Sequence, residues 1–403
     1  MNKNIKLNIF LNTFGSIFYC ICQWSLTIVV VKIASYELAG YLSLAMTTSS
    51  SFSAIALFSM RNYQISDVKE QYSSNVYLGS RIFTSVIAFI CCLISAIFTY
   101  TGYQVLCILA FMVIRLTEAI VDVLHGINQK YNHYEYIGIS YIFRGIITAA
   151  LFPALLMVSG NLPFTLAVIA GMNIMATGIF DWRKTYSIDH FRITLWNKKI
   201  WKLLKECAPI ALFSFLLSLE NLIPKSILQA EFGTEMLGIY SSVSSPVLVV
   251  QVFASVAFTP LLPVISQAIH NGEKKQFKSM IHKTYFVFIG MGIIILLGAS
   301  IFGKLGLKIL FGESILPYYS ILMPIVLSVL LTGMVWVLSS VVIALRKTNI
   351  LLIGMIFNFI FCIILSLNLI KQMGMNGVSL VQIIMLAIYI MFLVIICETI
   401  KLN

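Results

Sequence analysis

One uninterrupted apolar stretch, residues 350–370, reads ILLIGMIFNFIFCIILSLNLI and contains no charged side chain. A helix of roughly 20 apolar residues is long enough to cross the hydrocarbon core of a bilayer, so this stretch predicts a transmembrane helix. Similar runs recur along the whole chain, and about 12 of them have the required length. The predicted spans are residues 9–31, 38–60, 76–100, 105–125, 136–158, 162–180, 207–230, 237–266, 281–302, 315–338, 350–370 and 378–396.

The composition agrees with these spans. Of the 403 residues, 60% are hydrophobic and only 10% are charged, whereas about a quarter of the residues in a soluble domain are charged. A disordered chain needs low hydrophobicity, and 8 cysteines are too few for a secreted disulfide scaffold of this length. The sequence therefore predicts an all-α polytopic membrane protein.

The basic charge of the chain predicts its topology. The 27 Lys and Arg residues exceed the 15 Asp and Glu residues, which in a soluble protein would suggest nucleic acid as a partner. Here most of the cations, Arg81 among them, fall in or beside connections that are cytoplasmic if the N-terminus is inside. We therefore predict cytoplasmic N- and C-termini and no nucleic-acid partner. The few cations on the opposite side are Lys32, Lys304, Lys308 and Lys371.

The longest cytoplasmic connection divides the chain near its midpoint. Residues 182–206 contain Trp182, Trp196, Trp201 and several lysines, a pattern typical of an amphipathic helix on an anionic leaflet. We expect residues 1–181 to form one six-helix bundle and residues 207–403 a second one, joined by this connector.

The second half repeats features of the first at a constant offset, which indicates duplication, although three matches in apolar sequence also arise by chance. A polar stripe on each half's first span predicts that these helices face a water-filled cleft between two pseudo-symmetric bundles. Glu37, Gly40 and Ser43 align with Glu235, Gly238 and Ser241, and Ser16, Cys20, Gln23 and Thr27 align with Ser214, Ser218, Asn221 and Lys225.

Ionised side chains inside spans need a partner, water or a function. Arg115, Glu118 and Asp122 share one face of the fourth span, and Arg144 lies at similar depth in the fifth. We expect Glu118 or Asp122 to pair with Arg144. One interpretation of this group is a self-neutralising structural network.

The functional interpretation is a cationic cleft for an anionic substrate, since guanidinium groups bind phosphate oxygens bidentately. Lys225 could instead extend its ammonium group to the nearby membrane interface. The substrate-binding candidates are Arg115, Arg144, Lys225, Gln23 and Asn221, and the candidates for ion coupling or ion pairing are Glu118, Asp122 and Glu220.

Catalytic and cofactor motifs are not found. The chain has no Walker phosphate-binding loop, no Gly-x-Ser-x-Gly sequence and no Cys-x-x-Cys pair. We therefore predict neither a catalytic site nor a metal or cofactor.

Two local segments resemble polysaccharide flippases of the multidrug/oligosaccharidyl-lipid/polysaccharide exporter superfamily. The first is residues 61–67, RNYQISD, in which Arg61, Tyr63, Gln64 and Asp67 carry the resemblance. The second is residues 237–242, LGIYSS, and residues 223–225, IPK, lie just upstream of it. The tenth span departs from the expected symmetry because it has no charge.

The resemblance implies two six-helix bundles around a central cleft in the bacterial cytoplasmic membrane. It implies a flippase for undecaprenyl-diphosphate-linked oligosaccharides in O-antigen or capsule assembly, working by alternating access alongside glycan polymerases. A drug or metabolite antiporter of the same fold is the alternative and predicts a more acidic cleft. A membrane-embedded glycan polymerase or acyltransferase usually needs a large outer loop, which this chain lacks.

Overall fold

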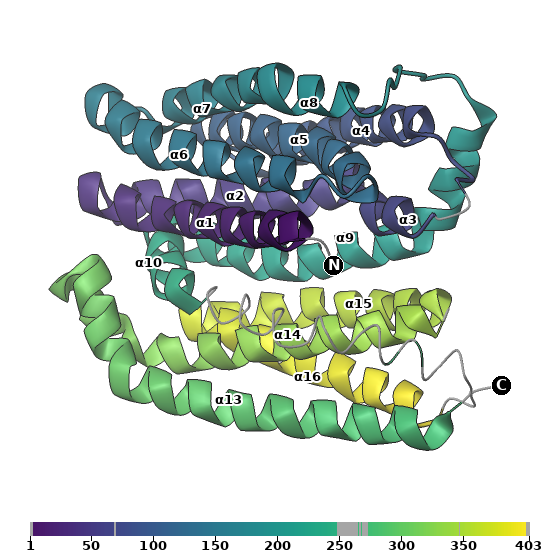
Figure 1. Cartoon of the computed structure of the whole chain (residues 1–403). Helices are drawn as coiled ribbons and strands as arrows, with labels where there is room; N and C mark the ends of the chain where they lie inside the picture. Colours follow the sequence, from purple (N-terminus) through teal and green to yellow (C-terminus); the bar gives the residue numbers. More distant parts are fainter. Residues whose placement is uncertain are drawn as a thin grey trace. The chain divides into compact units, whose positions relative to one another are not determined.

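The computed structural model describes residues 3–67, 70–247, 265, 267, 273–345 and 347–399 (Figure 1). Every regular element in these ranges is helical. Clustering of contacts divides the chain into two compact units, Met1–Ser218 and Leu219–Asn403. Each unit is described separately below as unit 1 and unit 2.

Unit 1 is built around helix α5, which packs against α2, α4 and α7 and also contacts α3 and α6. Helices α1 and α6 lie side by side along their length (Figure 1). The elements are α1 (Lys3–Ile33), α2 (Tyr36–Leu57), α3 (Met60–Ser66), α4 (Ser74–Thr99), α5 (Gly102–Lys130), α6 (Tyr134–Ser159), α7 (Leu162–Ala176), the π-helix η1 (Thr177–Trp182), α8 (Arg183–Tyr186) and the first part of α9 (Lys198–Phe232).

Local sequence explains where several of these helices begin. The Ser35 side chain accepts a hydrogen bond from the Leu38 amide at the start of α2, and Thr101 and Gln104 form a capping box on α5. Helices α1 and α6 approach closely at two glycines. A Cβ atom on Gly15 would lie 2.9 Å from the Gly138 Cα atom, so side chains at these positions would push the helices apart.

Unit 2 contains the rest of α9 and seven further described elements. Helix α16 packs against α14 and α15, and α13 packs against α14. The elements are α10 (Thr234–Ser244), the short 3-10 helices η2 (Ser245–Val247) and η3 (Glu313–Ile321), α13 (Lys274–Phe311), α14 (Leu322–Ala344), α15 (Thr348–Met373) and α16 (Met375–Thr399).

Ten described helical segments are long and apolar enough to cross a membrane. Helix α2 corresponds to the predicted span 38–60, but it is not among the ten, and the serines and threonines at residues 47–51 lower its hydropathy. The predicted span 237–266 lies largely outside the described residues. The helical architecture confirms the predicted fold class of an all-α polytopic membrane protein.

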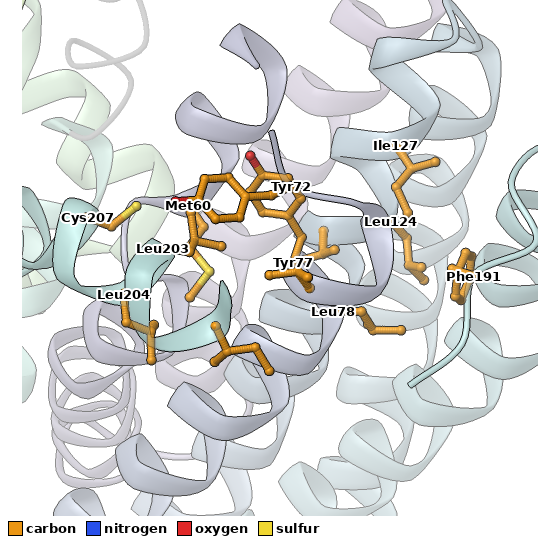
Figure 2. Close-up of a cluster of buried hydrophobic side chains, with 13 residues drawn as sticks. Met60, Tyr72, Tyr77, Leu78, Leu124, Ile127, Phe191, Leu203, Leu204 and Cys207 are labelled. Atoms are coloured by element: carbon orange, nitrogen blue, oxygen red, sulfur yellow. The ribbon is translucent and has the colours of Figure 1, made fainter. Parts of the chain in front are cut away.

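The predicted connector is not one continuous helix, because residues 187–197 lie outside any helix. Residues 190–197 have no regular structure, while Lys198 already belongs to α9, the same helix that forms the predicted seventh span. The physical reason is the buried Phe191 side chain, which joins the hydrophobic cluster shown in Figure 2 together with Leu203 and Leu204. The non-helical segment before α9 brings Phe191 there, and the Asn197 side chain then caps α9 by accepting from the Lys199 amide at 2.9 Å.

Candidate functional site

Helix α5 places a line of polar side chains on one face. Arg115, Glu118, Asp122, His125 and Gln129 are spaced three or four residues apart, which stacks them along the helix. Because α5 is surrounded by other helices of unit 1, Glu118, Asp122, His125 and Gln129 each meet a partner from a neighbouring element.

The first part of this line joins α5 to α1. Arg115 Nη1 lies 2.7 Å from Glu118 Oε2, and the Tyr19 hydroxyl donates to the other oxygen of Glu118. Gln23 Nε2 in turn donates to the Tyr19 hydroxyl at 2.8 Å. The Arg115 side chain stays 22% exposed, so the ion pair with Glu118 does not enclose it completely.

The second part joins α5 to α3 and α4 through Asp122. One carboxylate oxygen lies 3.1 Å from Arg61 Nη1 and the other 2.8 Å from Arg81 Nη2. Arg81 is completely buried and also donates to the Ala56 carbonyl oxygen at 2.8 Å. Arg61 remains about one quarter exposed and donates to Gln129 as well.

Arg144 on α6 forms a separate buried cluster. It donates to Asp181 Oδ2 at 2.8 Å, to Asn173 Oδ1 at 2.8 Å and to Thr177 Oγ1 at 2.6 Å. Asn173, Thr177 and Asp181 are spaced four residues apart where α7 continues into the π-helix η1. His125 Nε2 lies 3.6 Å from the other oxygen of Asp181.

These contacts correct the expected pairing of Arg144 with Glu118 or Asp122. Each of those carboxylates contacts a guanidinium group from another residue, whereas the partner of Arg144 is Asp181. The α7 helix continues beyond residue 180, so Asp181 remains within the helix bundle and does not begin a cytoplasmic connector. The four-residue spacing of Asn173, Thr177 and Asp181 is the sequence signal that could have identified this partner.

The Arg81 side chain, which the sequence placed among cations beside a cytoplasmic connection, lies inside unit 1 and not at its surface. Its side chain is fully buried because Asp122 and the Ala56 carbonyl together accept two of its donors. Arg81 lies near the start of an apolar span, where cations at the membrane interface are also found. Its position in the sequence therefore did not reveal that its side chain is buried.

Unit 2 presents a different electrostatic pattern along α9. Glu220 is buried and accepts a hydrogen bond from Asn358 Nδ2 at 2.7 Å, and Asn221 accepts one from Gln382 Nε2 at 3.0 Å. Among the described residues, no carboxylate pairs with Lys225 and no cation pairs with Glu220. The two side chains are five residues apart, about 140° around the helix, so they face different neighbours.

Residues 61–67 join α3 to α5 and to the start of α9 at one end of unit 1. Tyr63 donates to Glu206 Oε2 at 2.5 Å, and Tyr72 donates to the same oxygen at 3.0 Å. Gln64 Nε2 donates to the Val123 carbonyl oxygen at 3.3 Å. Burial and the hydrogen bond to Glu206 raise the pKa of Tyr72 to about 12, and the Glu206 carboxylate also raises the pKa of Tyr63.

Asp67 completes this arrangement by folding the connection between α3 and α4. Its carboxylate accepts hydrogen bonds from the amides of Gln71 and Tyr72 at 3.0 Å, and from the Tyr77 hydroxyl at 3.3 Å. Tyr72 and Tyr77 lie in the hydrophobic cluster beside the start of α9 (Figure 2). Only Arg61 of the four motif residues reaches the charged line on α5.

The structure thus gathers Gln23, Arg115, Glu118, Asp122 and Arg61 into the polar network of unit 1. Arg144 lies in the adjoining buried cluster, and Lys225, Glu220 and Asn221 belong to unit 2. In unit 1 four guanidinium groups face three carboxylates, which leaves a small positive excess. Sequence reasoning missed Tyr19, Arg81 and Asp181.

Three comparisons place the chain among known proteins. A family model described as "Polysaccharide biosynthesis protein" matches residues 5–269. The capsular polysaccharide biosynthesis protein CapF of Staphylococcus aureus is 28% identical over 383 residues, which cover 91% of this chain and 92% of CapF.

Two solved structures share the fold. The lipid II flippase MurJ in an inward closed conformation superposes with a TM-score of 0.72 at 15% identity, covering 97% of this chain and 88% of MurJ. An inward-facing multidrug resistance MATE family transporter gives a TM-score of 0.70 at 13% identity, covering 97% and 98% of the two chains.

Proposed function

Because the chain belongs to the polysaccharide biosynthesis protein family, we propose that it moves undecaprenyl-diphosphate-linked oligosaccharides across the bacterial cytoplasmic membrane. The membership confirms the resemblance to polysaccharide flippases of the exporter superfamily, and the fold shared with MurJ and a MATE transporter agrees with it. The similarity to a capsular polysaccharide protein over nine tenths of the chain favours a glycan precursor over a drug as substrate.

The observation that carries this proposal is Lys225, a cation within a membrane-spanning helix. No carboxylate pairs with it in the part of the chain that the structure describes. An unpaired ammonium group inside a span costs free energy, so the presence of Lys225 in this helix indicates a ligand that neutralises its charge. A diphosphate is such a ligand. Within unit 1, Arg115 and Arg61 are partly exposed guanidinium groups that carboxylate partners hold in place, and they are further candidates for contact with an anionic substrate.

Arg144 has a different role in this account. Its side chain is almost completely buried, and Asp181, Asn173 and Thr177 accept its hydrogen bonds. We propose that Arg144 holds α6 against the helix formed by α7 and η1, and that it does not contact the substrate.

Glu220 is the candidate for binding a coupling proton or cation. Glu118 and Asp122 already contact guanidinium groups, whereas the buried Glu220 carboxyl group contacts the neutral carboxamide of Asn358. A buried carboxylate without a cationic neighbour favours uptake of a proton or metal cation. Binding and release of that cation during alternating access would couple transport to an ion gradient.

The same account places the protein in the inner membrane with both termini in the cytoplasm. This orientation rests on the clustering of Lys and Arg in one set of connections. A surface-glycan polymerase is the expected partner, because translocated repeat units need an enzyme that joins them on the outer face.

Deletion of the gene in the native host tests the proposal. Surface polysaccharide should disappear and lipid-linked repeat units should accumulate on the cytoplasmic face, and the wild-type gene supplied in trans should restore both. Repeat units that reach the outer leaflet at the normal rate in the deletion strain contradict the proposal.

A further inference from the structure

A basic and aromatic surface surrounds the start of α9, and the proposed transport function does not use it. We call it the basic belt and define it by its exposed residues. Trp196 is 96% exposed and Trp201 is 62% exposed. The cations of the basic belt are Arg192, Lys198, Lys199, Lys202 and Lys205.

The cations of the basic belt are not neutralised by pairing. None of them forms an ion pair with a carboxylate in the described parts of the chain. The acidic residues nearest in sequence have other partners, since Ser74 donates to Asp189 at 2.5 Å and the hydroxyls of Tyr63 and Tyr72 donate to Glu206. The basic belt therefore presents a net positive surface.

Packing fixes the direction in which these side chains point. Ile200, Leu203 and Leu204 face inward from the first turns of α9 and join the hydrophobic cluster of Figure 2. Helical periodicity then directs Lys198, Lys202 and the side chains beside them outward. The surface is thus held in place by buried residues on the opposite face.

The basic belt continues into a stripe that suits contact with lipid. The Trp201 ring meets the Phe83 ring of α4 edge to face, with ring centroids 5.1 Å apart. From Phe83 an exposed apolar stripe runs along α4 through Ile87, Ile90 and Ile94. On a membrane-spanning helix this stripe faces acyl chains, so Trp201 lies where the apolar stripe meets the cations.

We propose that the basic belt binds the phosphate headgroups of anionic phospholipids in the leaflet that contacts the start of α9. Tryptophan rings favour the boundary between headgroups and acyl chains, and juxtamembrane lysines and arginines attract anionic lipid. Continuity with the stripe on α4 favours a lipid over an acidic protein partner. Bound lipid stabilises the start of α9, the helix that passes from unit 1 into unit 2.

Native mass spectrometry of the full chain tests this inference. The protein is equilibrated with equal amounts of phosphatidylglycerol and phosphatidylcholine, and the bound lipids are counted. The test variant replaces Lys198, Lys199, Lys202 and Lys205 with glutamine. The matched control replaces the same number of lysines elsewhere, namely Lys32, Lys304, Lys308 and Lys371.

We expect the wild type and the control variant to retain phosphatidylglycerol about fivefold better than phosphatidylcholine. The test variant should lose that preference. The proposal is overturned if the test variant prefers phosphatidylglycerol as strongly as the wild type does. It is also overturned if the test and control variants lose this preference to the same extent.

A second variant separates loss of binding from loss of folding. Replacing the same four lysines with arginine keeps the charge, so it should keep the preference for phosphatidylglycerol and its decrease at high salt. Loss of the preference in a folded arginine variant also contradicts the proposal. The inference does not depend on the transported substrate, so a failed transport assay leaves it standing.

Discussion

Arg144 on α6 and Asp181 in the π-helical segment after α7 form an ion pair at 2.8 Å in which both side chains are almost completely buried. Asn173 and Thr177 complete the hydrogen bonding of the guanidinium group. The pair therefore joins two neighbouring helices through a satisfied polar cluster, and its stability depends on both charges being present.

Removing one charge of this pair should destabilise unit 1. Asp181→Asn leaves the Arg144 charge buried without its counter-ion, which costs about 3–5 kcal/mol in comparable buried pairs. The measurement is the thermal unfolding midpoint of the purified variant in detergent. The double variant Arg144→Met, Asp181→Leu removes both charges and should recover much of the loss. An unchanged midpoint for Asp181→Asn would show that the pair is not structural.

Lys225 should be required for transport and not for folding. Lys225→Gln removes a charge that has no counter-ion among the described residues, so the unfolding midpoint should stay the same. Loss of a charge-assisted contact of about 1.5–3 kcal/mol should weaken the apparent substrate affinity by about 10-fold to 100-fold. Lys225→Arg should retain part of the activity. Lys304→Gln is the control because it removes the same charge from an exposed lysine elsewhere in unit 2. Normal transport by Lys225→Gln would mean that Lys225 only extends to the interface.

Glu220 should determine how transport depends on an ion gradient. Glu220→Gln keeps the size of the side chain and a hydrogen bond with Asn358, but it cannot exchange a proton or bind a cation through charge. We expect the variant to bind substrate while its transport no longer responds to an imposed proton or sodium gradient. The measurement compares transport into vesicles with and without each gradient. A variant that responds to a gradient as the wild type does rules out Glu220 as the coupling group.

Tyr72 should stabilise the contact between the start of α4 and the start of α9 in a pH-dependent way. Its hydroxyl donates to Glu206, and its pKa in the folded protein is raised to about 12, whereas an unfolded tyrosine has a pKa near 10. A pKa raised by folding gives stability that is fully present below about pH 10 and is lost as the pH rises through about 12.

The measurement is the difference in unfolding midpoint between the wild type and Tyr72→Phe at pH 8 and at pH 11.5. Lysine titration affects both proteins equally and cancels in this difference. We expect the difference to shrink at the higher pH. A constant difference would show that the Tyr72 hydroxyl does not stabilise the fold through its neutral form.

The spans could be predicted because the cost of exposing polar groups to lipid forces long apolar runs, and such runs are visible without tertiary information. The alignment of Arg115, Glu118 and Asp122 along one helix face could also be predicted, since it depends only on helical periodicity. The partners of those charges could not. Arg81 and Asp181 lie near predicted span ends, where a buried ion pair and a solvated interfacial charge look the same in sequence.

The predicted connector is a second case in which tertiary packing, which the sequence pattern does not show, determines the local structure. Its tryptophans and lysines indicated an amphipathic helix, but the burial of Phe191 accompanies a non-helical segment before α9. Periodicity describes a helix in isolation, whereas the position of Phe191 depends on its packing against side chains of α4 and α5. The composition of residues 182–206 did not reveal that residues 187–197 lie outside any helix.

Reconstitution tests the central claim most directly. Purified protein is placed in vesicles that contain a fluorescent polyprenyl-diphosphate-linked oligosaccharide, and the label in the outer leaflet is bleached by a reductant that does not cross the membrane. A flippase should make nearly all of the label accessible over time, and Lys225→Gln should slow this sharply. If the inner half of the label remains protected as in protein-free vesicles, the chain does not translocate this lipid and the account is wrong.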